Sequence, residues 1–245
     1  MNFFIGTSGY SYPKWKGSFY PAKIPAKQML SFYSSRFQSV EINSTFRSLP
    51  SASVLESWAE QVPGQFRFVL KAPQKITHIR RLKDADATVG AFLEVAGALK
   101  KRLGPLLFQL PPNFKKDLPR LIAFLALLPK GCRAAMEFRH PSWFDDEVFA
   151  LLSKHKTALC IADTDGGPKI PIEATAQWGY VRLRKSNYSA AALKAWAVNL
   201  KAQPWRECFV FFKHEDEGKG PKMAARLMEI FQPDSTAPAK KHSAK

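Results

Sequence analysis

The chain has 245 residues, of which 46% are hydrophobic, and it carries a formal net charge of +17 at pH 7. Its length matches the roughly 250 residues typical of a single (β/α)8 barrel, and its apolar content is sufficient for a sizeable core. Because no stretch approaches about 18 consecutive apolar residues, the sequence excludes a transmembrane helix.

Eight short apolar runs recur along the chain, and most of them end in a polar or charged residue. They cover residues 3–6, 39–43, 66–71, 105–109, 134–139, 158–163, 180–184 and 208–213. Helical periodicity fills nearly every gap between them, for example over 26–37 and 87–101. The gap at 166–176 instead holds helix breakers and no amphipathic pattern. We therefore predict an α/β fold, a TIM-type (β/α)8 barrel whose sixth helix is missing or reduced.

A single domain is expected over residues 1–232, followed by a basic, disordered tail at 233–245. A doubly wound open sheet is the rival fold. It is disfavoured because eight units with short connections fit a closed barrel. The glycines Gly6 and Gly9 also lack the G-x-G-x-x-G spacing, and no helix follows them directly.

The start of the chain and its cysteines both indicate a cytoplasmic protein. Residues 1–6 enter a strand without the basic start and cleavage site of a signal peptide. Cys132, Cys160 and Cys208 are odd in number, and they have neither disulfide nor zinc spacing. We interpret them as buried free thiols, and we expect no membrane partner.

Reactive groups of a barrel enzyme sit at the C-terminal ends of the strands. Because side chains alternate along a strand, Glu41 and Asn43 are expected to point into the barrel, while Val40 and Ile42 face the helices. The same reasoning applied to all the strands and the loops after them gives the predicted ligand-binding residues. These are Ser8, Tyr10, Trp15, Asn43, Lys71, Gln109, Arg139, Trp143, Asp163, Arg182, Arg184 and Lys213.

Three residues are candidates for proton transfer: Glu41, Glu137 and His140. If both carboxylates point inward, they could act as acid and base, with one pKa raised by burial. The alternative is a structural salt-bridge network in which Lys71 and Arg139 neutralise them, since buried charges must be paired. His140 precedes a proline in the loop after its strand, so it is a general base, a substrate donor or a loop cap.

A set of cations is expected to converge on the C-terminal end of the barrel, which we call the mouth. These are Lys71, Arg139, Arg182, Arg184 and Lys213. Arginine offers a planar fork suited to phosphate or carboxylate, and lysine offers a mobile charge or a tunable amine. Lys71 would be able to form a Schiff base if desolvated, although the sequence shows no desolvation. Tyr10, Trp15 and Trp143 are expected to rim this face, where they either stack on a ligand or pack on the scaffold.

Several sequence segments along the chain resemble the signature segments of the YecE-like family, which is domain of unknown function family 72. They include residues 6–10 (GTSGY), 40–46 (VEINSTF), 104–112 (GPLLFQLPP) and 137–143 (EFRHPSW). The resemblance implies a TIM-type barrel and an undetermined activity, and it assigns no catalytic residue. The last third departs from the common family pattern: Arg184-Lys185 and Lys213-His214 stand where many members carry His-Gly and Asn-rich segments. This exchange makes the mouth more basic.

Two classes of function follow from these residues. The first is an enzyme, a hydrolase, isomerase or lyase, acting on a phosphorylated or otherwise anionic small molecule. The second is a nucleic-acid-binding or nucleic-acid-processing protein that uses the same basic mouth. Neighbouring lysines and arginines would compete with a metal ion, so we expect no metal and no cofactor. The sequence does not indicate the oligomeric state.

Overall fold

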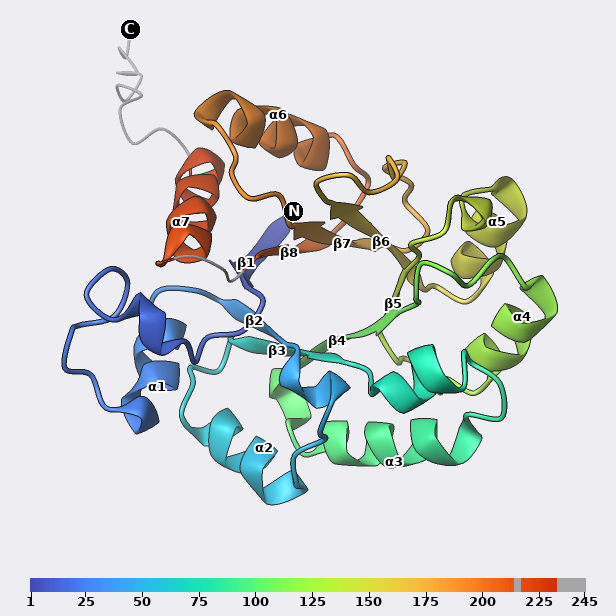
Figure 1. Ribbon diagram of the computed structural model, residues 1–245, viewed down its shortest axis with the longest axis horizontal. Helices are drawn as coiled ribbons and strands as arrows, with labels where there is room; N and C mark the ends of the chain where they lie inside the picture. Colours follow the sequence, from blue (N-terminus) through green and yellow to red (C-terminus); the bar gives the residue numbers. More distant parts are fainter. Residues whose placement is uncertain (214–216, 233–245) are drawn as a thin grey trace, which may run out of the picture.

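The computed structural model describes residues 1–213 and 217–232, and Figure 1 shows parallel strands surrounded by helices. The strands are β1 (Asn2–Thr7), β2 (Ser39–Ile42), β3 (Arg67–Lys71), β4 (Leu103–Gln109), β5 (Ala134–Glu137), β6 (Ala158–Asp163), β7 (Trp178–Leu183) and β8 (Glu207–Phe212). The α-helices are α1 (Met29–Ser34), α2 (Ala52–Glu60), α3 (Asp86–Gly97), α4 (Leu118–Ala126), α5 (Asp146–Lys154), α6 (Ala190–Lys201) and α7 (Lys219–Phe231).

The eight strands form one sheet in the order β1-β8-β7-β6-β5-β4-β3-β2, with parallel pairing throughout. The two ends of this sheet, β1 and β2, approach each other at their C-terminal ends. There Ser8 pairs with Glu41, and the Gly9 amide donates to the Glu41 carbonyl at 2.7 Å. The sheet is therefore a nearly closed barrel, which confirms the predicted single-domain TIM-type fold.

The rest of the seam between β1 and β2 is filled by the Tyr33 hydroxyl of α1. This hydroxyl accepts a hydrogen bond from the Thr7 amide at 2.8 Å and donates to the Ser39 carbonyl at 3.2 Å. Gly6 lies beside it, and a Cβ at this position would come within 1.9 Å of the Ser39 oxygen. The close approach of the two strands therefore requires glycine.

Apolar side chains fill both sides of the barrel wall. Outward residues such as Val40 and Phe68 join the core between the strands and the helices. Inward residues form a second cluster inside the barrel: Val69, Leu107, Ala135, Ala158, Cys160, Trp178, Tyr180, Phe209 and Phe211. Alternation along each strand produces this division. The middle of the lumen is thus packed with apolar side chains, and charged side chains lie at its two ends, including the Arg133–Glu207 ion pair at the N-terminal end.

No helix connects β6 to β7 in the described residues 164–177, as the breakers at Gly166, Gly167, Pro168 and Pro171 predicted. This connection is anchored at its far end by Thr175. Its hydroxyl accepts from the Leu159 amide and donates to the Thr157 carbonyl, both at 2.8 Å. The segment therefore follows the outside of β6 without a helix.

The first predicted helix is shorter than expected. Instead of covering 26–37, it consists of a 3-10 turn at Ala26–Gln28 and then α1, which ends at Ser34. The Ser34 and Ser35 hydroxyls donate to the carbonyls of Ser31 and Phe32, at 3.0 and 2.7 Å. Such side-chain bonds compete with helix continuation and explain the early end.

Two other expectations concern the ends of the chain and the membrane. The predicted tail at 233–245 lies outside the described residues. Of the helices in the described ranges, none combines the length and apolarity that a bilayer crossing requires. The cytoplasmic location stays a prediction.

Candidate functional site

A layer of polar side chains lies at the C-terminal end of the barrel, directly above the apolar lumen. On β3 and β4 the inward position changes from Val69 to Lys71 and from Leu107 to Gln109. Inward positions recur every two residues, so each strand that reaches this level contributes one side chain. The layer consists of Glu41, Lys71, Gln109, Glu137 and Arg182.

Arg182 of β7 joins the two carboxylates of the layer. Its Nη2 lies 2.7 Å from Glu41 Oε1, and its Nη1 lies 2.5 Å from Glu137 Oε2. All three residues are at most 1% exposed. Charges removed from water in this way persist only when they are paired and hydrogen-bonded. The guanidinium fork therefore pairs with both carboxylates at once, and the remaining negative charge is balanced by Arg139, which also pairs with Glu137.

Further hydrogen bonds saturate the Glu41 carboxylate. Oε1 also accepts from the Ser8 hydroxyl at 2.7 Å and from Asn43 Nδ2 at 3.0 Å, while Oε2 accepts from the Tyr180 hydroxyl at 2.6 Å. The predicted inward placement of Glu41 and Asn43 is confirmed. So many donors hold the carboxylate in one orientation and in its charged form.

Glu137 is held from the other side by the amide of Gln109. Gln109 Nε2 donates to Glu137 Oε1 at 2.6 Å, and its Oε1 accepts from Lys71 Nζ at 2.8 Å. Arg139 Nε adds a bond to Glu137 Oε1 at 3.1 Å. Gln109 thus connects the lysine to the buried carboxylate, which fixes the direction in which its amide points.

The pKa values of both glutamates are lowered. Burial by itself would raise the pKa of each carboxyl group, but the charge and hydrogen bonds of Arg182, together with the neighbouring arginines, outweigh it and bring each pKa to about 2. The prediction that burial raises one of the two pKa values is therefore wrong. The predicted salt-bridge network exists, but its central cation is Arg182 and not Lys71.

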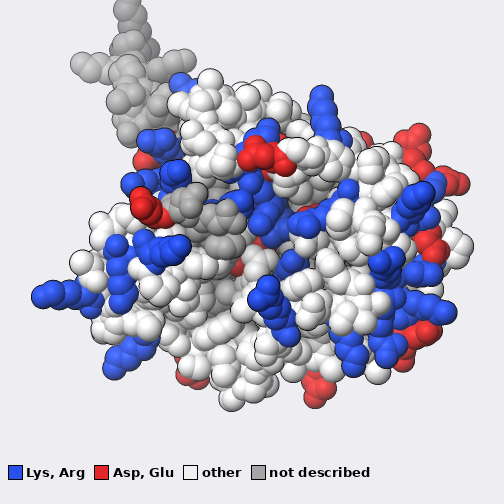
Figure 2. Space-filling model, in the orientation of Figure 1, with Lys and Arg blue, Asp and Glu red and all other residues white. Residues whose placement is uncertain are grey.

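The remaining cations surround the open end of this layer. Arg184 donates from Nη1 to the Ser8 hydroxyl at 3.4 Å, Arg139 is about one-third exposed, and Lys213 follows the inward Phe211 at the end of β8. In Figure 2 the blue side chains gather around the middle of this face. The structure therefore brings the predicted basic residues together at the mouth.

The pKa of Lys71 is lowered towards neutral pH. Burial and the positive charge of Arg182 lower the pKa of its amine to about 8, against the opposing effect of Glu137 and Glu41. The ammonium group also lies 4.1 Å from the centre of the Phe46 ring. The desolvation that the sequence did not show is thus present.

Other predicted site residues have structural roles. Trp15 and Trp143 are buried, and Trp143 Nε1 donates to the Phe114 carbonyl at 2.7 Å. Of the two alternatives left open for these rings, packing on the scaffold is the one that the structure shows. His140 caps the turn at Pro141–Trp143, where Nδ1 accepts from the Ser142 amide. Tyr10 is half-buried.

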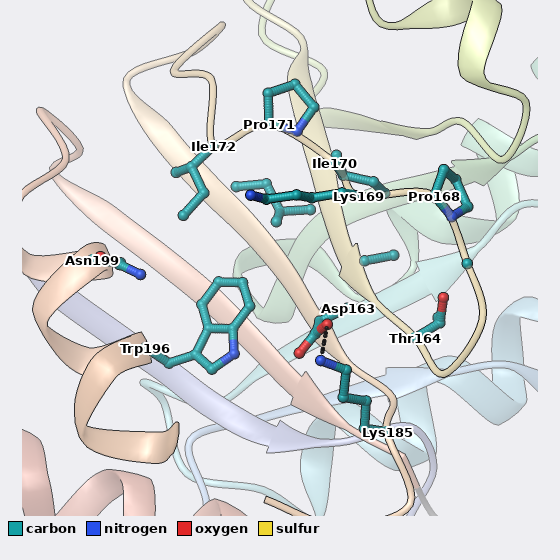
Figure 3. Close-up of a pocket in the computed structure, with 13 residues that line it drawn as sticks. Asp163, Thr164, Pro168, Lys169, Ile170, Pro171, Ile172, Lys185, Trp196 and Asn199 are labelled. Atoms are coloured by element: carbon teal, nitrogen blue, oxygen red, sulfur yellow. Dashed lines mark ion pairs between the residues drawn. The ribbon is translucent and has the colours of Figure 1, made fainter. Parts of the chain in front are cut away.

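Asp163 lies outside the mouth, which corrects its predicted position. Its Oδ1 pairs with Lys185 Nζ at 2.8 Å, and its Oδ2 accepts from the Tyr188 hydroxyl at 3.0 Å. It lines a cavity of about 550 Å³ between the helix-free β6–β7 connection and α6 (Figure 3), together with residues that include Ile172 and Trp196. Asp163 ends β6 on the outward face, so alternation alone accounts for this placement.

Three residues of the site were missed by the sequence analysis: Tyr180, Phe46 and His78. Tyr180 is two positions before Arg182 on β7, so alternation could have placed it inside the barrel. Phe46 and His78 lie after β2 and β3, with their ring centres 4.8 Å apart in a T-shaped contact. No periodicity marks residues of such loops.

In the described ranges, no three side chains of His, Cys, Asp or Glu gather as metal ligands would. Asp163 and Glu137 face opposite sides of the barrel wall. The carboxylates that do reach the mouth are bonded to Arg182. This arrangement offers an incoming group hydrogen-bond donors and positive charge.

Comparison with known proteins places the chain among relatives without an assigned activity. The model of "Protein of unknown function DUF72" matches residues 4–245. The UPF0759 protein YecE of Escherichia coli is 35% identical over 142 residues, which are 58% of this chain and 50% of that protein. The UPF0759 protein YunF of Bacillus subtilis is 30% identical over 60% of this chain and 54% of that protein. The chain spans about half the length of these curated relatives.

Two solved structures share the fold. A DUF72 family protein of Thermotoga maritima, TM1631, superposes with a TM-score of 0.82 and 26% identity, covering 94% of this chain and 99% of that one. A second, EF0366 of Enterococcus faecalis, has a TM-score of 0.75 and 20% identity over 94% and 97% of the two chains. The second comparison shows the fold alone.

Proposed function

Because this chain belongs to the DUF72 family, whose description names no activity, its function has to be inferred from its own residues. We propose that it is an enzyme that acts on a phosphorylated or otherwise anionic small molecule at the C-terminal end of its barrel. The observation that carries the proposal is the arrangement of charge at the C-terminal end of the barrel. Arg182 and Arg139 pair with the buried Glu41 and Glu137, so two cations balance the two carboxylates. Arg184 and the ammonium form of Lys71 add further positive charge, so the mouth attracts an anionic ligand.

The two arginines nearest the opening suit an anionic group. Arg139 uses Nε on Glu137, and Arg184 makes a long 3.4 Å bond to Ser8, so other N–H groups of both forks can turn to a ligand. Arginine forks bind phosphate and carboxylate oxygens bidentately. Glu41 and Glu137 act in this proposal as positioning residues, because carboxylates with a pKa of about 2 hold no proton at neutral pH.

Ligand binding tests the proposal directly. We expect phosphate or phosphorylated sugars to raise the melting temperature of the protein, and native mass spectrometry to detect an anionic compound that co-purifies with it. The double variant Arg139→Gln/Arg184→Gln should lose at least tenfold in affinity. Lys222→Gln/Arg226→Gln, an equal charge change at two exposed positions of α7, should bind as the parent does. Equal binding by both variants would refute the proposed clamp.

A nucleic acid is the alternative ligand of the same mouth. Two of the aromatic rings expected to stack on bases, Trp15 and Trp143, are buried, which favours the small molecule. Oligonucleotide affinity measured between 50 and 200 mM salt separates the two proposals. A steep loss that persists after residues 233–245 are removed, and that Arg139→Gln/Arg184→Gln abolishes, would favour the nucleic acid.

A further inference from the structure

Lys71 is set apart from the other groups of the mouth by its surroundings. Its Nζ donates to Gln109 Oε1 at 2.8 Å and lies over the Phe46 ring at 4.1 Å. Gln109 cannot readily turn away, because its Nε2 is bonded to the buried Glu137 at 2.6 Å. One side of the amine is thus held by the amide and another by an aromatic ring. The half-buried side chain still reaches the mouth.

Burial favours the neutral form of the Lys71 amine, and the charges around it act in both directions. The charged groups that act on it come from three strands: Glu41 on β2, Glu137 and Arg139 around the end of β5, and Arg182 on β7. The nearby His78 belongs to the turn after β3, and the positive charge of Lys71 helps to lower its pKa. Both glutamates are committed to Arg182, so they stabilise the ammonium form less than their number suggests. The Phe46 ring attracts the ammonium form, but burial outweighs this attraction and lowers the pKa of Lys71.

The other nucleophilic or titratable groups nearby are less suited to react. Glu41 and Glu137 are saturated with hydrogen bonds. Cys160 lies inside the barrel, where burial raises the pKa of its thiol well above the usual range. His140 is engaged in capping the turn that follows β5. Among the described groups of the mouth, Lys71 therefore combines access, a fixed position and a substantial neutral fraction near physiological pH.

We propose that Lys71 is the nucleophile of this site and forms a Schiff base with the carbonyl group of an anionic aldehyde or ketone. This inference rests on the proposed function, because Arg139 and Arg184 would hold the anionic group of the substrate. It narrows the substrate class to carbonyl compounds that carry a phosphate or carboxylate. Desolvation next to other cations is an established way to activate a lysine for this chemistry.

The reaction balances without any further reagent. The lone pair of neutral Nζ attacks the carbonyl carbon, and a C–N bond forms while the carbonyl π electrons move to oxygen. One amine proton passes to that oxygen, which gives a carbinolamine. The hydroxyl group then takes a proton and leaves as water while the C=N bond forms. An amine and a carbonyl compound thus give an imine and water.

Trapping with a matched pair of aldehydes tests the proposal on the intact chain. The probe is glycolaldehyde phosphate, its neutral counterpart is glycolaldehyde, and cyanoborohydride reduces any imine to a stable secondary amine. Peptide mass spectrometry then measures the rate of modification at Lys71 and at Lys101, an exposed lysine before β4 at the opposite end of the barrel. No variant is needed for this comparison.

With a pKa of about 8, about a quarter of Lys71 is neutral at pH 7.5, against roughly one in a thousand for an ordinary lysine. We expect Lys71 to be modified at least tenfold faster than Lys101, with a rate that rises with pH and levels off above about pH 8. The phosphorylated probe should react faster than glycolaldehyde. Lys71→Arg should remove the modified peptide and leave the rate at Lys101 unchanged.

The outcomes separate this inference from the proposed function. Modification of Lys71 no faster than that of Lys101 overturns the inference, even if phosphate still binds and Arg139→Gln/Arg184→Gln abolishes that binding. Fast modification of Lys71 by both aldehydes equally, unaffected by the same double variant, supports the nucleophile but refutes the anion clamp. Fast, phosphate-dependent modification that the double variant slows supports both.

Discussion

Arg182 and Glu41 meet across the barrel, with Nη2 of the arginine 2.7 Å from Oε1 of the glutamate, although their strands, β7 and β2, are five positions apart in the order of the sheet. The contact therefore spans the lumen. The second arm of the guanidinium reaches Glu137, so one side chain links β2, β5 and β7. The stability of the barrel and the charge of its mouth both depend on this cation.

Removal of Arg182 is expected to destabilise the fold strongly. Arg182→Met would leave Glu41 buried without its paired cation and Glu137 with Arg139 alone, and breaking a buried pair in this way costs about 3–5 kcal/mol. Urea unfolding at pH 7 measures the loss. Arg226→Gln is the control and should change the free energy of unfolding by less than about 0.5 kcal/mol. A loss as small as that of the control would contradict the role given to Arg182.

The free energy of unfolding of Arg182→Met should change with pH in the opposite direction from that of the parent. Without Arg182, burial raises the pKa values of the two carboxyl groups, so Arg182→Met should recover part of its stability between pH 7 and pH 5 as they take up protons. The parent should not gain stability over this interval through these groups. Urea midpoints at the two pH values give the comparison.

The parent protein should lose stability in acid. Glu41 and Glu137 have pKa values of about 2 in the folded state, below the value of about 4.3 in an unfolded chain. Their contribution is therefore complete above about pH 4.3 and is lost as the pH falls towards 2. Glu41→Gln, although less stable, should show a shallower decline in the free energy of unfolding over this window. An equal slope in both proteins would refute the assignment.

Gly6→Ala is expected to be severely destabilising because its Cβ would lie 1.9 Å from the Ser39 carbonyl oxygen. Backbone must move to relieve this contact, and overpacking of this kind costs about 1–3 kcal/mol or more. Gly90→Ala in α3 is a matched control, since nothing lies within 4 Å of its Cβ position. That variant should stabilise the helix by about 0.5–1 kcal/mol. Thermal unfolding of the two variants should shift in opposite directions.

Tyr33→Phe tests the hydroxyl that fills the seam between β1 and β2. The change leaves the Thr7 amide and the Ser39 carbonyl without their bridging partner, which costs about 1–3 kcal/mol for a buried donor. Hydrogen exchange at the Thr7 amide should accelerate more than exchange at amides of β4, on the far side of the sheet. Uniform acceleration would indicate a general loss of stability without a local opening.

Much of the fold was predictable from alternation and breakers. The period of two along residues 39–43 and 66–71 correctly assigned Glu41 and Lys71 to the inside and Val40 and Phe68 to the outside. Breakers in the 166–176 segment correctly predicted the missing helix. The resemblance to the YecE-like family implied the same TIM-type barrel. Each of these signals is local, so a few neighbouring residues carry it.

The pairing of charges in the site was not predictable in this way. The sequence suggested Lys71 and Arg139 as partners of the carboxylates, whereas Arg182 takes the central position. Alternation states which face a side chain occupies but not which residue it meets across the lumen. That depends on the stagger of strands that are far apart in sequence.

The sequence by itself determined the barrel and the set of polar side chains at one end of it, because backbone geometry imposes these on any chain with this periodicity. Only the tertiary structure decided that Glu41 and Glu137 remain charged, that Lys71 is desolvated and that Trp15 and Trp143 lie in the core. Charge state and burial arise from distances between residues that folding brings together. They are therefore properties of the assembled mouth and not of any single strand.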